Sequence, residues 1–335
     1  MEMTLQSFQI ILSAIGLIVI FGIFLLCIVL ALSKRKGGGQ SGSGEVIKFE
    51  NLSEKFAKRK QELLMKLGDK EELKELKKQQ KEVDKSKEKK GRVYFIDFEG
   101  DMKASQVKQL KKQVNTILQV VKKEDEVVVG VTSGGGLVSP YGLGASQLQR
   151  IKDAGIELTC CVDTVAASGG YMMASVAPKI LAAPFAVVGS IGVVATVPNI
   201  HKLLKKNDVD VHMVTAGKYK RTLTLLGENT EEGEQKFKEE LTEVHTLFKD
   251  HVVTHRPNLN LEEVATGEYW YGKKAQEMGL IDGIQTSDGL LMEKMKTHTV
   301  YQVKVEKKEG VLGSLRKQAT LLIEKTLYNS GNPWF

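Results

Sequence analysis

Residues 164–175 contain the clearest candidate for a nucleophile. They read T-V-A-A-S-G-G-Y-M-M-A-S, so Ser168 follows small apolar residues and precedes two glycines, where we expect a helix to begin. A serine hydroxyl becomes a strong nucleophile only when a neighbouring base takes its proton. None of the six histidines lies in a glycine-rich or otherwise distinctive context. We therefore interpret the histidines as surface or packing residues, although a Ser-His-Asp triad stays open.

Lysine can act as this base in place of histidine. Burial disfavours the charged ammonium form, which lowers the pKa of a lysine and frees its lone pair. The candidates are Lys218 and Lys220, in the stretch T-A-G-K-Y-K-R-T-L-T that directly follows the mainly apolar run 209–214. The residues alone do not choose between these two lysines.

Three glycine-rich turns each follow a predicted strand: T-S-G-G-G-L (132–137), A-S-G-G-Y (167–171) and G-S-I-G-V (189–193). Glycine allows backbone N–H groups to approach a ligand closely. The phosphate-binding patterns G-x-x-x-x-G-K-[ST] and G-x-G-x-x-G before a helix are absent from the sequence. An oxyanion hole is the other chemical use of such turns. Three ordinary connections between strands and helices are the alternative.

The motifs together resemble the signal peptide peptidase A family. The resemblance rests on V-A-A-S-G-G-Y-M-M-A-S, then G-S-I-G-V, then G-K-Y-K-R-T-L-T, and the closing Y-W-Y-G-K-K-A-Q-E-M-G-L-I-D-G-I (269–284), and it covers about residues 92–284. A single peptidase domain behind an N-terminal anchor is similar to the branch of this family in the inner membrane of Gram-negative bacteria.

The resemblance implies a Ser–Lys dyad. By motif position, Ser168 is the nucleophile, Lys220 is the general base and acid, and Ser190 orients the lysine. The backbone N–H groups of Gly135 and Gly169 correspond to the oxyanion donors. The turn here reads T-S-G-G-G, whereas S-P-G-G is common in the family, so Gly134 and Gly136 remain alternatives to Gly135.

The resemblance also implies a crotonase-like α/β fold, with a core of repeated ββα units related to that of ClpP. It implies a homo-oligomeric ring with inward-facing active sites, polypeptide substrates such as signal peptides and other short or unfolded chains, and no metal or nucleotide cofactor. The alternatives are a crotonase-like acyl-CoA enzyme and an inactive membrane scaffold. The presence of Ser168, Lys220 and Ser190 favours the peptidase.

The elements that must position these residues are predicted from short apolar strands that alternate with helices. Residues 126–131, E-V-V-V-G-V, have almost no polar alternation, as expected for a strand buried on both faces. The alternation indicates an α/β fold with mostly parallel pairing. The other predicted strands are 93–98, 156–162 and 180–183, and the predicted helices are 104–121, 147–154, 171–177 and 231–253.

A membrane anchor is predicted at the N-terminus. Residues 8–32 carry no charge, and as a helix they are long enough to cross a bilayer of about 30 Å with some tilt. A cleavable signal peptide is the rival, but residues 1–7 contain no Lys or Arg. The basic stretch 33–36 predicts that the following domain faces the cytoplasm, whereas family members exist with the catalytic domain on the other side.

The remaining composition assigns no further partner. Residues 54–90 hold 14 Lys or Arg against 9 Asp or Glu, which accounts for most of the net charge of +7. A solvated charged helix explains this better than nucleic-acid binding, and contact with anionic lipid is the alternative. The three cysteines (Cys27, Cys160 and Cys161) form neither a C-x-x-C pair nor a disulfide framework. We expect four segments: an anchor with its basic flank (1–36), a linker and charged helical segment (37–91), a peptidase domain (92–300) and a C-terminal extension (301–335).

Overall fold

The computed structural model describes residues 45–69, 71–75, 78 and 91–307 of the chain. The chain divides into two compact units, residues 47–305 and the two ends 1–46 and 306–335, and the fold below is that of residues 47–305. The predicted anchor, residues 8–32, lies outside the described residues. Within the described part of the chain, no helix is long and apolar enough to cross a membrane.

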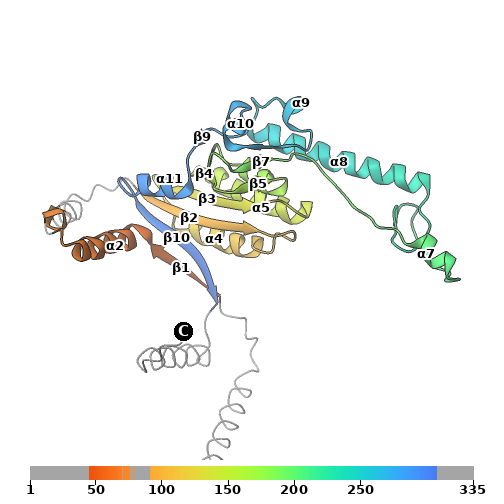
Figure 1. Ribbon diagram of the computed structural model, residues 1–335, viewed down its shortest axis with the longest axis horizontal. Helices are drawn as coiled ribbons and strands as arrows, with labels where there is room; N and C mark the ends of the chain where they lie inside the picture. The colour runs from red at the N-terminus through yellow and green to blue at the C-terminus, as the bar shows by residue number, and fades with distance from the viewer. Residues whose placement is uncertain (1–44, 70, 76–77, 79–90, 308–335) are drawn as a thin grey trace, which may run out of the picture. The chain divides into compact units, whose positions relative to one another are not determined.

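The core is a mixed α/β structure around one sheet (Figure 1). Its main path runs in the order β1-β10-β2-β3-β4-β6-β9, and β2, β3, β4 and β6 pair in parallel, as predicted. The strands of this path are β1 (Glu45–Asn51), β2 (Arg92–Gly100), β3 (Glu126–Ser133), β4 (Glu157–Val162), β6 (Lys179–Ala182), β9 (Gly283–Ile284) and β10 (Thr299–Lys307).

A second branch of the sheet leaves the end of β3. Strand β5 (Val165–Ala167) pairs in parallel with β3 and with β7 (Val187–Gly189), and β7 pairs antiparallel with β8 (Tyr269–Tyr271). This branch holds two of the three glycine-rich turns at its strand ends. At three residues each, β5, β7 and β8 are too short to show a periodic pattern, and none of them was predicted.

Both faces of the sheet are covered, which explains the unbroken apolar run of β3. Val127 and Val129 belong to one buried cluster and Val128 to another on the opposite face. The adjacent Cys160 and Cys161 of β4 divide between the same two clusters, as alternation along a strand requires. Both cysteines are free, and burial raises the pKa of each thiol.

The helices follow the predicted order with longer or shifted bounds. Helix α4 buries Leu110, Val114 and Ile117 against the sheet at helical spacing. The predicted helix 147–154 is the second half of α5, and the predicted helix 171–177 begins earlier, as α6. The helices are α2 (Leu52–Leu67), α4 (Val107–Val120), α5 (Val138–Asp153), α6 (Gly169–Ala174), α7 (His201–Lys206), α8 (Glu231–His255), α9 (Leu261–Val264), α10 (Gly272–Glu277) and α11 (Ser287–Lys294).

The segment before β2 includes a strand as well as the predicted helix. Strand β1 pairs with β10 beside β2, and α2 follows it directly. The side chain of Asn51 accepts a hydrogen bond from the Glu54 N–H at the start of α2, and Gly68, at a φ of 75°, ends it. Leu52 lies in the buried cluster that also contains Phe95 of β2. Residues 47–67 are therefore part of the domain that follows them.

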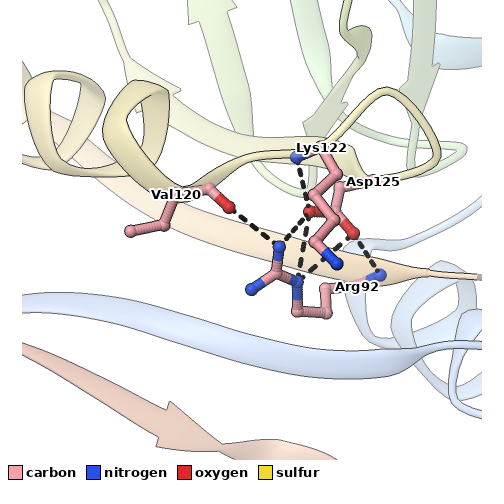
Figure 2. Close-up of polar contacts among 4 residues, drawn as sticks. All are labelled: Arg92, Val120, Lys122 and Asp125. Atoms are coloured by element: carbon pink, nitrogen blue, oxygen red, sulfur yellow. Dashed lines mark hydrogen bonds and ion pairs between the residues drawn. The ribbon is translucent and has the colours of Figure 1, made fainter.

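A partly buried ion pair joins the start of β2 to the turn between α4 and β3 (Figure 2). The guanidinium of Arg92 donates to the Asp125 carboxylate, with Nη2 2.7 Å from Oδ2, and also to the Val120 carbonyl. The backbone N–H groups of Arg92 and Lys122 donate to the same carboxylate. Burial alone would raise the pKa of Asp125, but these donors together hold that pKa below its ordinary value. The carboxylate therefore stays charged inside the domain.

Candidate active site

The three glycine-rich turns lie together at the carboxyl ends of neighbouring parallel strands. Ser133 of β3 is in register with Ala166 of β5, and Ala167 of β5 is in register with Gly189 of β7. Ser168 and Ser190 therefore follow directly after paired residues. The Ser168 N–H donates to the Gly189 carbonyl at 2.8 Å, which ties the two turns to each other. Crevices outside the carboxyl ends of such strands are where α/β folds bind ligands.

Both serines have unusual backbone conformations. Ser168 has a φ of 51° and a ψ of −119° at the start of α6, and Ser190 has a φ of 51°. Among the described residues other than glycine, only Ala104 and Asp208 also have positive φ. Such conformations cost roughly 1–3 kcal/mol and persist where the surrounding structure enforces them, often at active sites. A strained serine between a strand and a helix is the arrangement that exposes a nucleophile in many hydrolases.

Gly135 and Gly169 hold their backbones close to Ser168 because neither has a side chain. A Cβ on Gly135 would lie 2.7 Å from the Cβ of Ser168 and 2.8 Å from the backbone nitrogen of Gly169. A Cβ on Gly169 would lie 2.4 Å from the ring of Tyr141. Gly135 also has a φ of 90°, which favours glycine. The structure thus brings Gly135 and Gly169, the two predicted oxyanion glycines, together at Ser168.

The backbone N–H groups of the glycine turn and of the start of α6 differ in their hydrogen-bond acceptors. The Gly169 N–H lies at the start of α6, where helical N–H groups lack an intrahelical acceptor, and the Ser168 side chain does not cap this end. The Gly135 N–H donates to the Ser133 Oγ at 3.0 Å. The Leu137 N–H donates to the Met102 carbonyl. Within the described part of the chain the Gly136 N–H has no hydrogen-bond partner.

Ser190 lies beside Ser168 with its hydroxyl held from one side. Its N–H donates to the Glu268 carbonyl at 2.7 Å, and its Oγ donates to the Gly267 carbonyl at 3.3 Å. Because the hydroxyl hydrogen is used in this way, the oxygen lone pairs remain able to accept a hydrogen bond from an incoming amine. This is the geometry expected of a residue that orients a lysine.

The two candidate lysines lie outside this cluster. Lys218 and Lys220 belong to the exposed segment between α7 and α8, which Figure 1 shows at the far end of α8. Lys218 forms an ion pair with Glu232 at 2.7 Å, and the hydrogen bond from that carboxylate raises the pKa of Lys218. Lys220 is exposed, and no described residue forms a hydrogen bond or ion pair with its ammonium group. Within one copy, therefore, Ser168 and Ser190 follow paired residues of neighbouring strands, and Lys220 lies on the exposed segment apart from them.

Comparison with known families assigns the chain. Models described as peptidase family S49 and as its N-terminal region match residues 150–301 and 3–148. The chain belongs to peptidase family S49. The class of enzyme that the motifs predicted, a peptidase, is that of the family.

Several relatives carry the name probable protease SohB. The Haemophilus influenzae protein is 55% identical over 232 residues, 69% of this chain and 66% of that protein. The protein of Buchnera aphidicola from Schlechtendalia chinensis is 52% identical over 202 residues, 60% and 66% of the two chains. That of Buchnera from Schizaphis graminum is 41% identical over 287 residues, 83% of each chain. The match therefore spans just under two thirds of the first two relatives and most of the third.

Within this S49 domain two histidines of α8 support the site without entering it. His251 Nε2 lies 2.8 Å from the Met172 carbonyl in α6, and His245 Nε2 lies 3.2 Å from the carbonyl of Ile191, which follows Ser190. Burial lowers the pKa of His251, and the hydrogen bond to the Met172 carbonyl opposes this shift. These positions agree with the packing role expected from the sequence. The described residues include no group of three or more His, Cys, Asp or Glu that could hold a metal ion.

Sequence reasoning missed two residues that build the site, Ser133 and Tyr141. Ser133 was visible as the first serine of T-S-G-G-G, but its side chain, rather than a backbone group, contacts Gly135. Tyr141 lies in α5 and is completely buried beneath Gly169. Nothing in its sequence context separates it from an ordinary core tyrosine.

Proposed function

We propose that this chain is a membrane-anchored serine endopeptidase that uses a Ser–Lys dyad. The observation that supports it most is the strained Ser168 held against the glycine turn and the first N–H of α6, in a member of a peptidase family. The packing of the core and the shortness of the turn do not by themselves require a serine with a positive φ at this position. The mixed α/β core around one sheet supports the crotonase-like architecture that the motifs imply, which is part of this proposal.

In the proposed reaction the Ser168 Oγ attacks a peptide carbonyl while a neutral Lys220 takes its proton. The carbonyl carbon becomes tetrahedral, and its oxygen carries the negative charge. Lys220 then gives the proton to the leaving amine, and an ester to Ser168 remains. Water attacks this ester with the same lysine as base, which releases the second product and restores the serine.

The tetrahedral oxyanion is held by backbone N–H groups in this proposal. The Gly169 N–H is one donor, as the motifs predicted. The motif position also assigns Gly135, but its N–H is bound to Ser133, whereas the Gly136 N–H has no described partner. We therefore assign the second donor to Gly136 and a spacing role to Gly135, whose Cα lies against Ser168.

The lysine is supplied by assembly in this proposal. A lysine acts as a base only in its neutral form, which burial away from water favours because desolvation disfavours the ammonium form. In one copy it is exposed, on a segment whose apolar side chains, such as Val209, Met213 and Val214, are also exposed. A homo-oligomeric ring would bury this segment and place Lys220 of one copy against Ser190 and Ser168 of its neighbour. In one copy Lys218 is instead paired with Glu232.

The substrates are polypeptides, in particular signal peptides and other short or unfolded chains, as the resemblance implies. Residues 8–32 would hold the enzyme in the bacterial inner membrane as a single-pass protein, close to membrane-released peptides. The mechanism above uses only groups of the chain and needs neither a metal nor a nucleotide.

The test measures cleavage of an unfolded protein and a signal-peptide mimic by the full chain in mild detergent. Ser168→Ala and Lys220→Ala should each abolish cleavage, and Lys218→Ala should retain it as the matched control. Cleavage by Lys220→Ala at the wild-type rate would show that another group is the base. A wild type that cleaves none of these substrates would favour the inactive scaffold.

A mixing experiment tests where the lysine comes from. Ser168→Ala and Lys220→Ala chains, dissociated and reassembled together, should recover activity that neither has alone, because a mixed assembly contains intact pairs at some interfaces. No recovery in assemblies shown to contain both chains would indicate that Lys220 serves the serine of its own copy.

A further inference from the structure

A chain of hydrogen bonds runs from the glycine turn to the buried hydroxyl of Tyr141. The Gly135 N–H donates to the Ser133 Oγ at 3.0 Å, and that oxygen lies 2.5 Å from the Tyr141 hydroxyl. The Tyr141 hydroxyl donates to the Asp101 carbonyl at 2.7 Å. Either hydroxyl can be the donor between Ser133 and Tyr141, and the Ser133 hydroxyl also donates to the Gly100 carbonyl at 3.2 Å. These groups form one connected network, in which hydrogen bonds strengthen one another.

The ring of Tyr141 contacts the other half of the site. It lies where a side chain of Gly169 would be, 2.4 Å from the position of a Cβ on that residue. Tyr141 is completely buried and Ser133 is 2% exposed, so neither hydroxyl can turn to water as an alternative partner. One side chain therefore touches both the start of α6, below the nucleophile, and the network that ends on the glycine turn.

We propose that Tyr141 is a positioning residue that sets the distance between the two halves of the oxyanion hole, acting on the Gly169 side through its ring and on the Gly134–Gly136 turn through Ser133. By holding the Gly135 N–H, Ser133 leaves the neighbouring N–H groups of the turn, Gly136 among them, as the candidate donors. This inference rests on the proposed peptidase function, because it concerns how that site stabilises its transition state.

The hydroxyl should therefore matter more for the reaction than for substrate binding. Oxyanion donors act where charge develops in the transition state, and the loss of one such donor lowers kcat by about 10²–10³-fold. Loss of a group that only positions a donor should cost less, about 10-fold or more, because the turn relaxes but keeps its N–H groups. The ground-state peptide contacts the rest of the cleft, so KM should stay within about 2-fold.

The experiment compares Tyr141→Phe and Ser133→Ala with the wild-type full chain in mild detergent. It measures kcat and KM on a fluorogenic peptide, the affinity of a peptide boronate that forms a tetrahedral adduct with Ser168, and the melting temperature. Each single variant should lose about 10-fold or more in kcat, with a parallel loss of boronate affinity. The double variant should be no worse than the singles, because all three break the same chain of hydrogen bonds.

Tyr171→Phe is the matched control. The Tyr171 hydroxyl is also completely buried, and it donates to the Leu280 carbonyl at 2.9 Å, away from the glycine turn. This variant should lower the melting temperature about as much as Tyr141→Phe and leave kcat unchanged.

Two results would overturn the inference. A Tyr141→Phe variant that loses thermal stability but keeps kcat and boronate affinity would show that the hydroxyl serves the fold alone. A Ser133→Ala variant with a higher kcat would show that Ser133 competes with the substrate for the Gly135 N–H. Failure of the proposed function is distinguishable, because wild type would then neither cleave the peptide nor react with a fluorophosphonate at Ser168.

Discussion

Replacement of Ser168 by glycine should stabilise the domain while it abolishes cleavage. Ser168 has a φ of 51° and a ψ of −119°, which glycine adopts without a steric penalty. The strain at such a residue is roughly 1–3 kcal/mol. Glycine relieves this strain, but it also makes the unfolded chain more flexible, which lowers the stability by about 0.5–1 kcal/mol. The Ser168 hydroxyl has no hydrogen bond within the described residues, so its loss costs little. The net gain expected is about 1 kcal/mol.

Ser168→Ala separates the strain from the loss of the hydroxyl. Alanine removes the nucleophile but keeps the Cβ, and with it the strained backbone. The free energy of unfolding, measured by urea denaturation of the full chain in mild detergent, should therefore be about 1 kcal/mol higher for Ser168→Gly than for Ser168→Ala. Neither variant should cleave peptide.

Ser175 provides the control on the same stretch of chain. It has an ordinary φ of −61° directly after α6, so glycine there should be less stable than alanine by about 0.5–1 kcal/mol. The sign of the difference between glycine and alanine should thus reverse between Ser168 and Ser175. If glycine is the less stable replacement at both positions, the turn at Ser168 is not strained and its unusual conformation says nothing about function.

Three further perturbations test the parts of the domain that support the site. Asp125→Ala should lower the free energy of unfolding by about 3 kcal/mol, because it leaves the partly buried Arg92 without its partner; Glu277→Ala, which breaks an exposed pair with Lys274, should change it by less than about 0.5 kcal/mol in the same urea titration. Burial, with the nearby His251 and Lys152, lowers the pKa of His255 from 6.5 to about 4, so the unfolded chain takes up a proton first as the pH falls. The stability that the neutral His255 contributes should be complete above about pH 6.5 and should decline toward pH 4, by about 1 kcal/mol because the ring is partly solvated. Urea titrations of His255→Gln across this pH range should show a smaller decline in the free energy of unfolding. An equal decline in the variant would assign the pH dependence to other groups. Gly169→Ala should lose about 1–3 kcal/mol of stability and most activity, because its Cβ would overlap the Tyr141 ring. Gly142→Ala in α5 should keep both, because no atom lies within 4 Å of the new Cβ. A fully active Gly169→Ala would contradict the close packing beneath Ser168.

The central strands could be predicted because burial on both faces leaves a mark in the sequence. The run at 126–131 has no polar alternation, and β3 indeed divides its valines between two buried clusters. Strands β5 and β7 carry no such mark, since V-A-A and V-V-G are too short for any period to appear. Strand β1 was missed for a different reason, because it precedes a long charged segment whose composition favours helix.

The candidate site was predictable in its residue types but not in its geometry. The motifs identified Ser168, Ser190 and the glycines, and the register of β5 with β7 places the two serines side by side. Their positive φ values could not be predicted, because serine seldom adopts them and only the surrounding packing enforces them. The role of Tyr141 depends on long-range contacts, 28 residues along the chain from Gly169, that no local pattern encodes.

The placement of Lys220 has a consequence for control of the proposed reaction. The parts that build the nucleophile and the oxyanion donors, from β3 to α6, belong to the buried core of one copy, so they are formed as soon as the domain folds. The proposed base, Lys220, lies on a segment that is exposed in one copy, whereas a lysine becomes a base more readily when it is buried. If assembly buries that segment, as we propose, a single folded copy has a prepared serine without a base. Cleavage would then begin only where copies meet, which would confine the peptidase to its assembled form.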